Sequence, residues 1–245
     1  MPNFKLTIEY DGSAYHGWQR QNDQATIQGV IEAAIGKMTQ KKVVLNASGR
    51  TDAGVHALGQ VANFCVDTTL SADVFFNGLN SLLKDDIVIK DCRVVDERFH
   101  ARFDAKSKLY HYHILNTPLP SAINRQYAWY IKRPLDVDKM QAAANYLIGE
   151  HDFKSFEGSG SPRAHTTRHI YRAAMSTNEP GHLRFAIEAN GFLRFMVRNI
   201  VGTLADVGLG QITPDQFKNI LQAKDRNLAS PTAPPQGLFL IRVNY

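Results

Sequence analysis

Asp52 is the carboxylate whose surroundings are best suited to chemistry. It lies in the segment Ser48–His56, which reads SGRTDAGVH and follows the apolar run Val43–Leu45. Small neighbours let a bulky substrate approach the carboxylate closely, and the guanidinium of Arg50 favours its ionised form. Two interpretations are open: Asp52 acts on a substrate, or Thr51–Gly54 is only a turn whose aspartate caps backbone amides.

A strand of alternating aromatic residues is the second candidate. Tyr110 and Tyr112 fall on one face of the predicted strand, and the imidazoles of His111 and His113 fall on the other. A tyrosine on a rigid strand can stack on a nucleobase, a contact worth about 1 to 3 kcal/mol per base, although core packing uses the same ring. The two histidines have no third ligand nearby in the sequence, so we expect no metal site.

Arg198 lies in an almost wholly apolar segment. Residues 192–204 read FLRFMVRNIVGTL, which predicts a buried helix with Arg194 and Arg198 one turn apart. Because a buried guanidinium without a partner is costly, we expect a carboxylate beside Arg198, and Asp52 is the candidate. At about 4 Å and an effective dielectric near 20, such a pair interacts by roughly 4 kcal/mol before desolvation is subtracted. A purely structural ion pair predicts the same contact.

Two α+β halves are expected to position these residues. In residues 1–104 an alternating strand opens the chain, and helices are expected after the caps Thr26 and Ser71. In residues 105–245 strands and helices alternate again, and Thr213–Gln216 forms a capping box before a further helix.

Composition limits the partners and the compartment. The 28 basic residues exceed the 23 acidic ones and give a net charge of +5, which favours a polyanionic partner if the basic residues share a face. Cys65 and Cys92 lack zinc spacing and are expected as buried thiols in a reduced, cytoplasmic compartment. No run approaches the roughly 18 apolar residues of a membrane span. The segment 157–165, with Arg163, is expected to be a loop that is either solvated or clamps phosphates.

Four segments together closely resemble the TruA family of tRNA pseudouridine synthases: Ser48–His56, Lys108–Tyr110, Phe192–Gly202 and Pro234–Leu238. The segments Tyr10–Gln19 and Thr26–Gln28 fit the family too, so the likeness covers nearly the whole chain in order. The resemblance implies two α+β halves with mainly antiparallel sheets, joined around a central basic cleft.

The resemblance also implies an activity. It implies an isomerase that converts uridine to pseudouridine at positions 38, 39 and 40 in the anticodon stem and loop of tRNA, without cofactor or required metal, usually as a homodimer. In that family the aspartate matching Asp52 is the catalytic nucleophile. The tyrosine matching Tyr110 contacts the target base, the arginine matching Arg50 assists base flipping, and the arginine matching Arg198 pairs with the aspartate.

The reaction leaves several alternatives open. An ionised Asp52 can add to the sugar carbon C1′ or remove its 2′ proton, and Tyr110 is a conceivable base for the C5 proton if its pKa is lowered or a water intervenes. A noncatalytic tRNA-binding protein would use Asp52 only to shape a turn. A nucleoside hydrolase or base glycosylase would use the same carboxylate and release free uracil.

Overall fold

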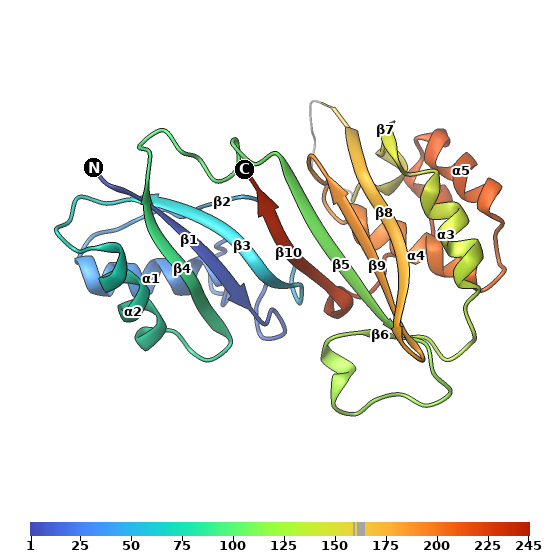
Figure 1. Cartoon of the computed structure of the whole chain (residues 1–245), viewed down its shortest axis with the longest axis horizontal. Coiled ribbons are helices and arrows are strands. Elements are labelled where there is room, and N and C mark those ends of the chain that lie inside the picture. The colour runs from blue at the N-terminus through green and yellow to red at the C-terminus, as the bar shows by residue number, and fades with distance from the viewer. Residues whose placement is uncertain (159, 161–164) are drawn as a thin grey trace. The chain divides into compact units, whose positions relative to one another are not determined.

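The computed structural model describes residues 1–158, 160 and 165–245, so Arg163 lies outside the described residues. Contacts divide the chain into two compact units (Figure 1): Met1–Lys106 with Phe239–Tyr245, and Ser107–Leu238. The sequence predicted a second domain that runs from 105 to 245. The structure instead groups Phe239–Tyr245 with the first unit, because this segment adds a parallel strand beside His56 and Ala57.

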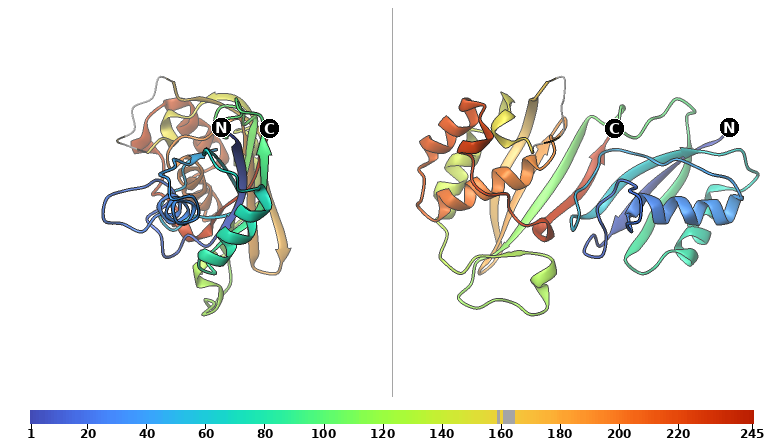
Figure 2. Two further views of the ribbon diagram at one scale, coloured as in Figure 1. Left: turned by 90° about the vertical axis from the view of Figure 1, so that its left-hand side faces the viewer. Right: turned by 180° about the vertical axis from the view of Figure 1, so that it is seen from behind.

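The first unit is built on one sheet with two helices. Its strands follow the order β4, β1, β3, β10, with β2 paired to β3. Figure 2 shows α1 in front of these strands when the molecule is seen from behind. The bounds are β1 Asn3–Tyr10, α1 Ile27–Thr39, β2 Asn46–Ala47, β3 His56–Cys65, α2 Ala72–Leu82, β4 Ile87–Val95 and β10 Leu238–Asn244.

Alternation in β1 builds the core of this unit. Every second side chain of the strand is buried, and the ring of Phe4 lies 5.3 Å from that of Phe64 and 4.7 Å from that of Phe75. These contacts attach α2 to the sheet through apolar burial. The predicted caps are confirmed, since Thr26 and Ser71 each accept a hydrogen bond from the amide three residues later.

In its described residues, the second unit combines mainly antiparallel strands with three α-helices. Its strands follow the order β5, β9, β8, β7, all antiparallel, and β6 adds to β5 in parallel. Figure 2 shows α3, α4 and α5 on one face of this sheet. The bounds are β5 Ser107–Leu115, β6 Trp129–Tyr130, α3 Val137–Asn145, β7 Gly149–Asp152, β8 Thr167–Glu179, β9 His182–Ala189, α4 Met196–Gly208 and α5 Pro214–Ala223, with 3-10 turns at Asn124–Gln126, Lys154–Phe156, Arg226–Leu228 and Pro235–Gly237.

The helix expected over residues 192–204 begins later than predicted. Phe195 has a φ of 60°, in the left-handed region, so the helical path starts only at Met196. Arg194 therefore precedes α4 and does not lie one helical turn from Arg198. The capping box is confirmed: the hydroxyl of Thr213 accepts from the amide of Gln216, whose side chain accepts from the amide of Thr213.

The predicted α+β class with mainly antiparallel sheets is confirmed, because within each unit most neighbouring strands run antiparallel. Across the described ranges, no helix is both long and apolar enough to cross a membrane. The central basic cleft stays a prediction.

Candidate active site

Asp52 occupies the first position of a tight turn in the first unit. Its carbonyl accepts a hydrogen bond from the amide of Val55 over 3.2 Å, and Gly54 has a φ of 76°. Such a φ strains residues with a Cβ, which explains the glycine. The side chain of Asp52 is half-buried. The turn that the sequence offered as one interpretation of Thr51–Gly54 is thus present. It leaves the carboxylate of Asp52 partly accessible.

The segment after β1 packs backbone against backbone on this turn. A methyl group at Gly12 would lie 2.1 Å from the carbonyl oxygen of Val55, and one at Gly17 would lie 2.6 Å from that of Thr51. The amide of Trp18 donates to the Thr51 carbonyl over 3.0 Å. The glycines of this segment therefore serve a close approach that holds the residues beside Asp52 in place.

A buried polar layer secures the segment that leads into the turn. The hydroxyls of Tyr10 and Thr51 lie 2.8 Å apart, and Gln60 accepts from the hydroxyl of Ser48 and donates to the carbonyl of Gly49. Burial raises the pKa of Tyr10 to about 12, so its phenol is neutral at ordinary pH. Each of these groups is hydrogen-bonded, as buried polar groups must be.

Two polar residues of α1 fix the chain just before the Asp52 segment. Gln28 donates to the Leu45 carbonyl over 3.3 Å, and Glu32 accepts from the Leu45 amide over 2.9 Å. Gln28 also donates to Glu32, and Arg20 pairs with Glu32 over 3.1 Å. This pair was not predicted from the sequence. The available signal was two polar residues four positions apart within the otherwise apolar buried face of a helix.

Arg50 lies on the same loop as Asp52 but is exposed. Within the described part of the chain it makes no hydrogen bond and no ion pair. The influence expected of its guanidinium on the carboxylate is therefore not exerted through a direct contact. An exposed, unanchored arginine is able to reach for a phosphate or a base.

Tyr110 and Tyr112 lie on the buried face of β5 in the second unit. Tyr110 is only 7% exposed, and its ring meets that of Phe192 edge to face at 5.1 Å. The hydroxyl of Tyr112 donates to the carbonyl of Pro234 over 2.7 Å. Burial raises the pKa of Tyr112 well above its usual range, and the charge of Arg198 lowers it by a smaller amount. Tyr112 thus packs and anchors, and Tyr110 offers a base little of its flat surface in this arrangement.

Arg198 is half-buried near the start of α4. Its Nε–H donates to the carbonyl of Ala233 over 2.8 Å, and the amide of Ala233 donates to the Arg198 carbonyl over 3.1 Å. The guanidinium carbon lies 5.1 Å from the ring centroid of Phe195, a cation–π contact. The Nε–H of Arg198 is therefore already bonded within the second unit. A carboxylate or phosphate that binds Arg198 would accept hydrogen bonds from its terminal guanidinium nitrogens. The predicted pairing with Asp52 remains a prediction.

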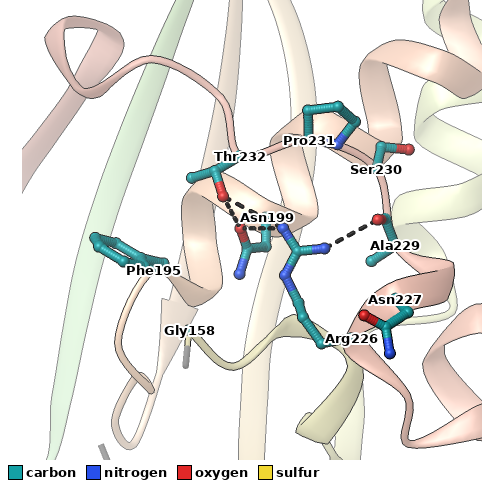
Figure 3. Close-up of a pocket in the computed structure, with 9 residues that line it drawn as sticks. All are labelled: Gly158, Phe195, Asn199, Arg226, Asn227, Ala229, Ser230, Pro231 and Thr232. Carbon is teal, nitrogen blue, oxygen red and sulfur yellow. Dashed lines mark hydrogen bonds between the residues drawn. The ribbon is translucent and has the colours of Figure 1, made fainter. Parts of the chain in front are cut away.

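A pocket of about 530 Å³ adjoins Phe195 (Figure 3). Arg226 and Asn199 point toward one another at its centre, and Thr232 bonds to both. It is lined by Gly158, Phe195, Asn199, Arg226, Asn227, Ala229, Ser230, Pro231 and Thr232.

Among the residues that the structure describes, no three or more His, Cys, Asp or Glu side chains gather in a group that could hold a metal ion. The rings of His111 and His113 lie 6.3 Å apart, centroid to centroid.

Comparison with known proteins identifies the family. A family model described as tRNA pseudouridine synthase matches residues 6–104 and 143–245. The tRNA pseudouridine synthase A of Thermoanaerobacter sp. (strain X514) is 49% identical over 245 residues, which cover 100% of both chains. Those of Acetivibrio thermocellus and Pseudothermotoga lettingae are 46% and 41% identical over the same full lengths.

Among solved structures, a chain of a Cbf5-Nop10-Gar1 complex aligns with 82% of this chain and 53% of its own length, at 12% identity and a TM-score of 0.36, which is too low to support an argument. The full-length relatives, by contrast, align with every segment discussed above, and the family model covers all but residues 1–5 and 105–142. The chain belongs to the tRNA pseudouridine synthase family.

Proposed function

We propose that this protein isomerises uridine to pseudouridine at positions 38, 39 and 40 in the anticodon stem and loop of tRNA, with Asp52 as the reacting carboxylate. Full-length identity to relatives named tRNA pseudouridine synthase A supports the reaction. One observation supports the role of Asp52 above others: a partly accessible carboxylate stands on a turn whose neighbours are locked by buried hydrogen bonds and glycine contacts.

The bonds that break and form in the isomerisation define what the residues of the protein must do. The C1′–N1 bond of the uridine breaks, the uracil turns while bound, C5 bonds to C1′, and the C5 proton leaves as N1 gains one. Atoms and electrons balance without an oxidant or reductant. Asp52 stabilises the electron-poor sugar either by adding to C1′ or by removing the 2′ proton, and both routes need it ionised.

The remaining residues handle the RNA. A base within a stem must be flipped out at a cost of a few kcal/mol, which phosphate contacts and aromatic contacts offset. Arg50 is exposed and fills the space that the flipped base leaves. Tyr110 contacts the flipped base by its edge or hydroxyl, and Arg198 orients Asp52 through its terminal nitrogens.

We also propose that the enzyme works in the cytoplasm as a homodimer. Each copy brings a net charge of +5, so a two-fold dimer doubles the basic surface offered to a large polyanion. Sedimentation or light scattering at working concentration tests this directly. A monomer that retains full activity would contradict it.

Product analysis separates the proposed activity from its alternatives. After incubation of unmodified tRNA with the protein, digestion to nucleosides and chromatography should yield pseudouridine in place of uridine. Free uracil would identify a glycosylase or hydrolase instead. Unchanged uridine with tight tRNA binding would identify a noncatalytic tRNA-binding protein. Sequencing the reacted tRNA then tests whether the change falls at positions 38 to 40.

A further inference from the structure

The loop Ala229–Ala233 lies directly against α4, along the helix face that carries Arg198. A methyl group at Gly202 would lie 2.0 Å from the carbonyl oxygen of Pro231, so only glycine allows this approach. The amide of Ser230 donates to the hydroxyl of Thr203 over 3.2 Å. Helix and loop are therefore in direct backbone contact one helical turn beyond Arg198.

Two successive carbonyl groups, one at the end of this loop and one just after it, each accept a hydrogen bond from a side chain. The Ala233 carbonyl accepts from the Nε–H of Arg198, and the next carbonyl, of Pro234, accepts from the hydroxyl of Tyr112. The reciprocal bond from the Ala233 amide to the Arg198 carbonyl completes the contact. The direction of the Arg198 guanidinium thus depends on where this loop lies.

Arg226 connects the other end of the loop to α4. One terminal nitrogen of its guanidinium donates to the carbonyl of Ala229 over 2.9 Å. The other donates to the side-chain oxygen of Asn199 over 3.1 Å and to the hydroxyl of Thr232 over 3.3 Å. The Thr232 hydroxyl in turn donates to Asn199 over 2.6 Å, and Asn199, fully buried, donates to the Phe156 carbonyl.

These hydrogen bonds indicate that the polar residues lining the pocket of Figure 3 hold the loop against α4. Both ends of the Asn199 amide are engaged, and Arg226 spends three hydrogen bonds on the loop and the helix. Burial lowers the pKa of Arg226, which reflects the cost of placing this cation here. A partly buried cation with three such hydrogen bonds fixes the backbone of the loop. The α4 residue that it contacts is Asn199, which directly follows Arg198 in the sequence.

We infer that Arg226 is a positioning residue for the isomerisation: by tying the loop Ala229–Ala233 to Asn199, it fixes the Ala233 carbonyl that directs the guanidinium of Arg198. This inference rests on the proposed function. A misplacement of about 1 Å far from the reacting atoms can lower a rate about a hundredfold, so a support of this kind affects turnover without touching substrate.

Single-turnover kinetics of Arg226→Met, with its stem kept and its guanidinium removed, test the inference. We expect the rate of the chemical step to fall about tenfold or more, while the Kd for tRNA changes by less than about twofold. Arg226→Lys, which keeps a cationic donor on a flexible stem, should recover part of the rate. Thr232→Val removes one hydroxyl from the network and should reduce the rate less, and it carries the test if Arg226→Met does not fold.

The double variant Arg198→Met/Arg226→Met separates positioning from general destabilisation. If Arg226 acts through Arg198, the double variant is no slower than Arg198→Met alone, because the two losses share one cause. Leu221→Ala, in the core of α5, is the matched control: it should lower Tm and leave the rate unchanged well below Tm.

The outcomes distinguish a failure of the role of Arg226 from a failure of the role of Arg198. A wild-type rate in both Arg226→Met and Thr232→Val, or rate losses that multiply in the double variant, would overturn the role of Arg226 and leave the proposed function standing. A wild-type rate in Arg198→Met would instead overturn the role of Arg198 on which the inference depends.

Discussion

The phenol of Tyr10 and the hydroxyl of Thr51 share a buried hydrogen bond of 2.8 Å, which fixes the residue that precedes Asp52. This contact connects the first strand of the chain to the candidate catalytic turn. We therefore expect Tyr10→Phe to lower the free energy of unfolding by about 1 kcal/mol, the usual value of one net hydrogen bond. Turnover should fall as well, because the turn loses a support.

Urea unfolding and single-turnover kinetics check this pair of effects. Tyr171→Phe, at an exposed position of β8, is the control and should change neither quantity. If Tyr10→Phe is destabilised and yet turns over at the wild-type rate, the hydrogen bond supports the fold but not the position of Asp52.

The raised pKa of Tyr10 predicts a pH dependence of stability. Between pH 10 and pH 12 the unfolded chain loses the phenol proton while the folded protein keeps it, since the folded pKa is about 12. The unfolded state then binds fewer protons, so this group stabilises the fold below pH 10 and its contribution is lost as pH rises to about 12, by roughly 3 kcal/mol. Tyr10→Phe lacks this loss.

Unfolding free energies of wild type and Tyr10→Phe at pH 9, 10, 11 and 12 provide the check. The wild type should be the more stable protein at pH 9, and the difference should shrink and reverse toward pH 12. A difference that stays constant over this range is incompatible with a buried neutral phenol.

Gly17 and Gly210 form a matched pair for testing the close approach to the Asp52 turn. Both have a positive φ, +85° and +71°, so alanine strains the backbone at either position by about 1 kcal/mol. Only at Gly17 would the new methyl group meet the turn, 2.6 Å from the Thr51 carbonyl; nothing lies within 4 Å at Gly210. Gly17→Ala should abolish most turnover, and Gly210→Ala should retain it.

Thermal unfolding measures the stability of the two alanine variants. The rate of tritium release from tRNA labelled at C5 of uridine measures their turnover. We expect Gly17→Ala to lose more stability than Gly210→Ala, because its methyl group also clashes with the turn, and we expect only Gly17→Ala to lose activity. Equal activity in both variants would mean that the segment after β1 does not hold the turn in its working geometry.

Arg50→Ala isolates the contribution of an exposed arginine to RNA handling. Because Arg50 bonds to no described residue, its removal should change the free energy of unfolding by less than about 0.5 kcal/mol. The rate of uridine isomerisation should fall, since the space of the flipped base is no longer filled. If the guanidinium also contacts phosphate, the slope of log affinity against log salt should decrease by about 1.

Stopped-flow measurement of tRNA carrying a fluorescent base analogue follows flipping directly, with Arg50→Lys as the conservative comparison. Unchanged flipping and turnover in Arg50→Ala would remove Arg50 from the mechanism.

Local signals were sufficient for much of the fold. The caps at Thr26, Ser71 and Thr213 can each be recognised from a few neighbouring residues. The starts of the helices that follow them were therefore predictable. The buried character of α4 followed from its apolar residues, but its first residue did not, because the left-handed φ of Phe195 depends on packing that no local pattern encodes.

Long-range pairing was harder to predict. The place of β10 beside β3 joins residues about 180 positions apart and has no local signature. The same holds for the anchor of Leu45 by Gln28 and Glu32 and for the bond of Arg198 to Ala233. The residue types around Asp52 marked it as a candidate, and its catalytic role stays a prediction. The residues that hold the turn could not be predicted in the same way, because the fold brings them to it from distant parts of the sequence.

Tritium release from tRNA labelled at C5 of uridine tests the central claim most directly, since the C5 proton leaves only when the new carbon bond has formed. Wild-type protein and the control Asp23→Asn, whose asparagine tolerates the positive φ at that position, should release tritium at the same rate. Asp52→Asn and Asp52→Ala should bind the tRNA and release none. Release at the wild-type rate by either Asp52 variant would contradict the account.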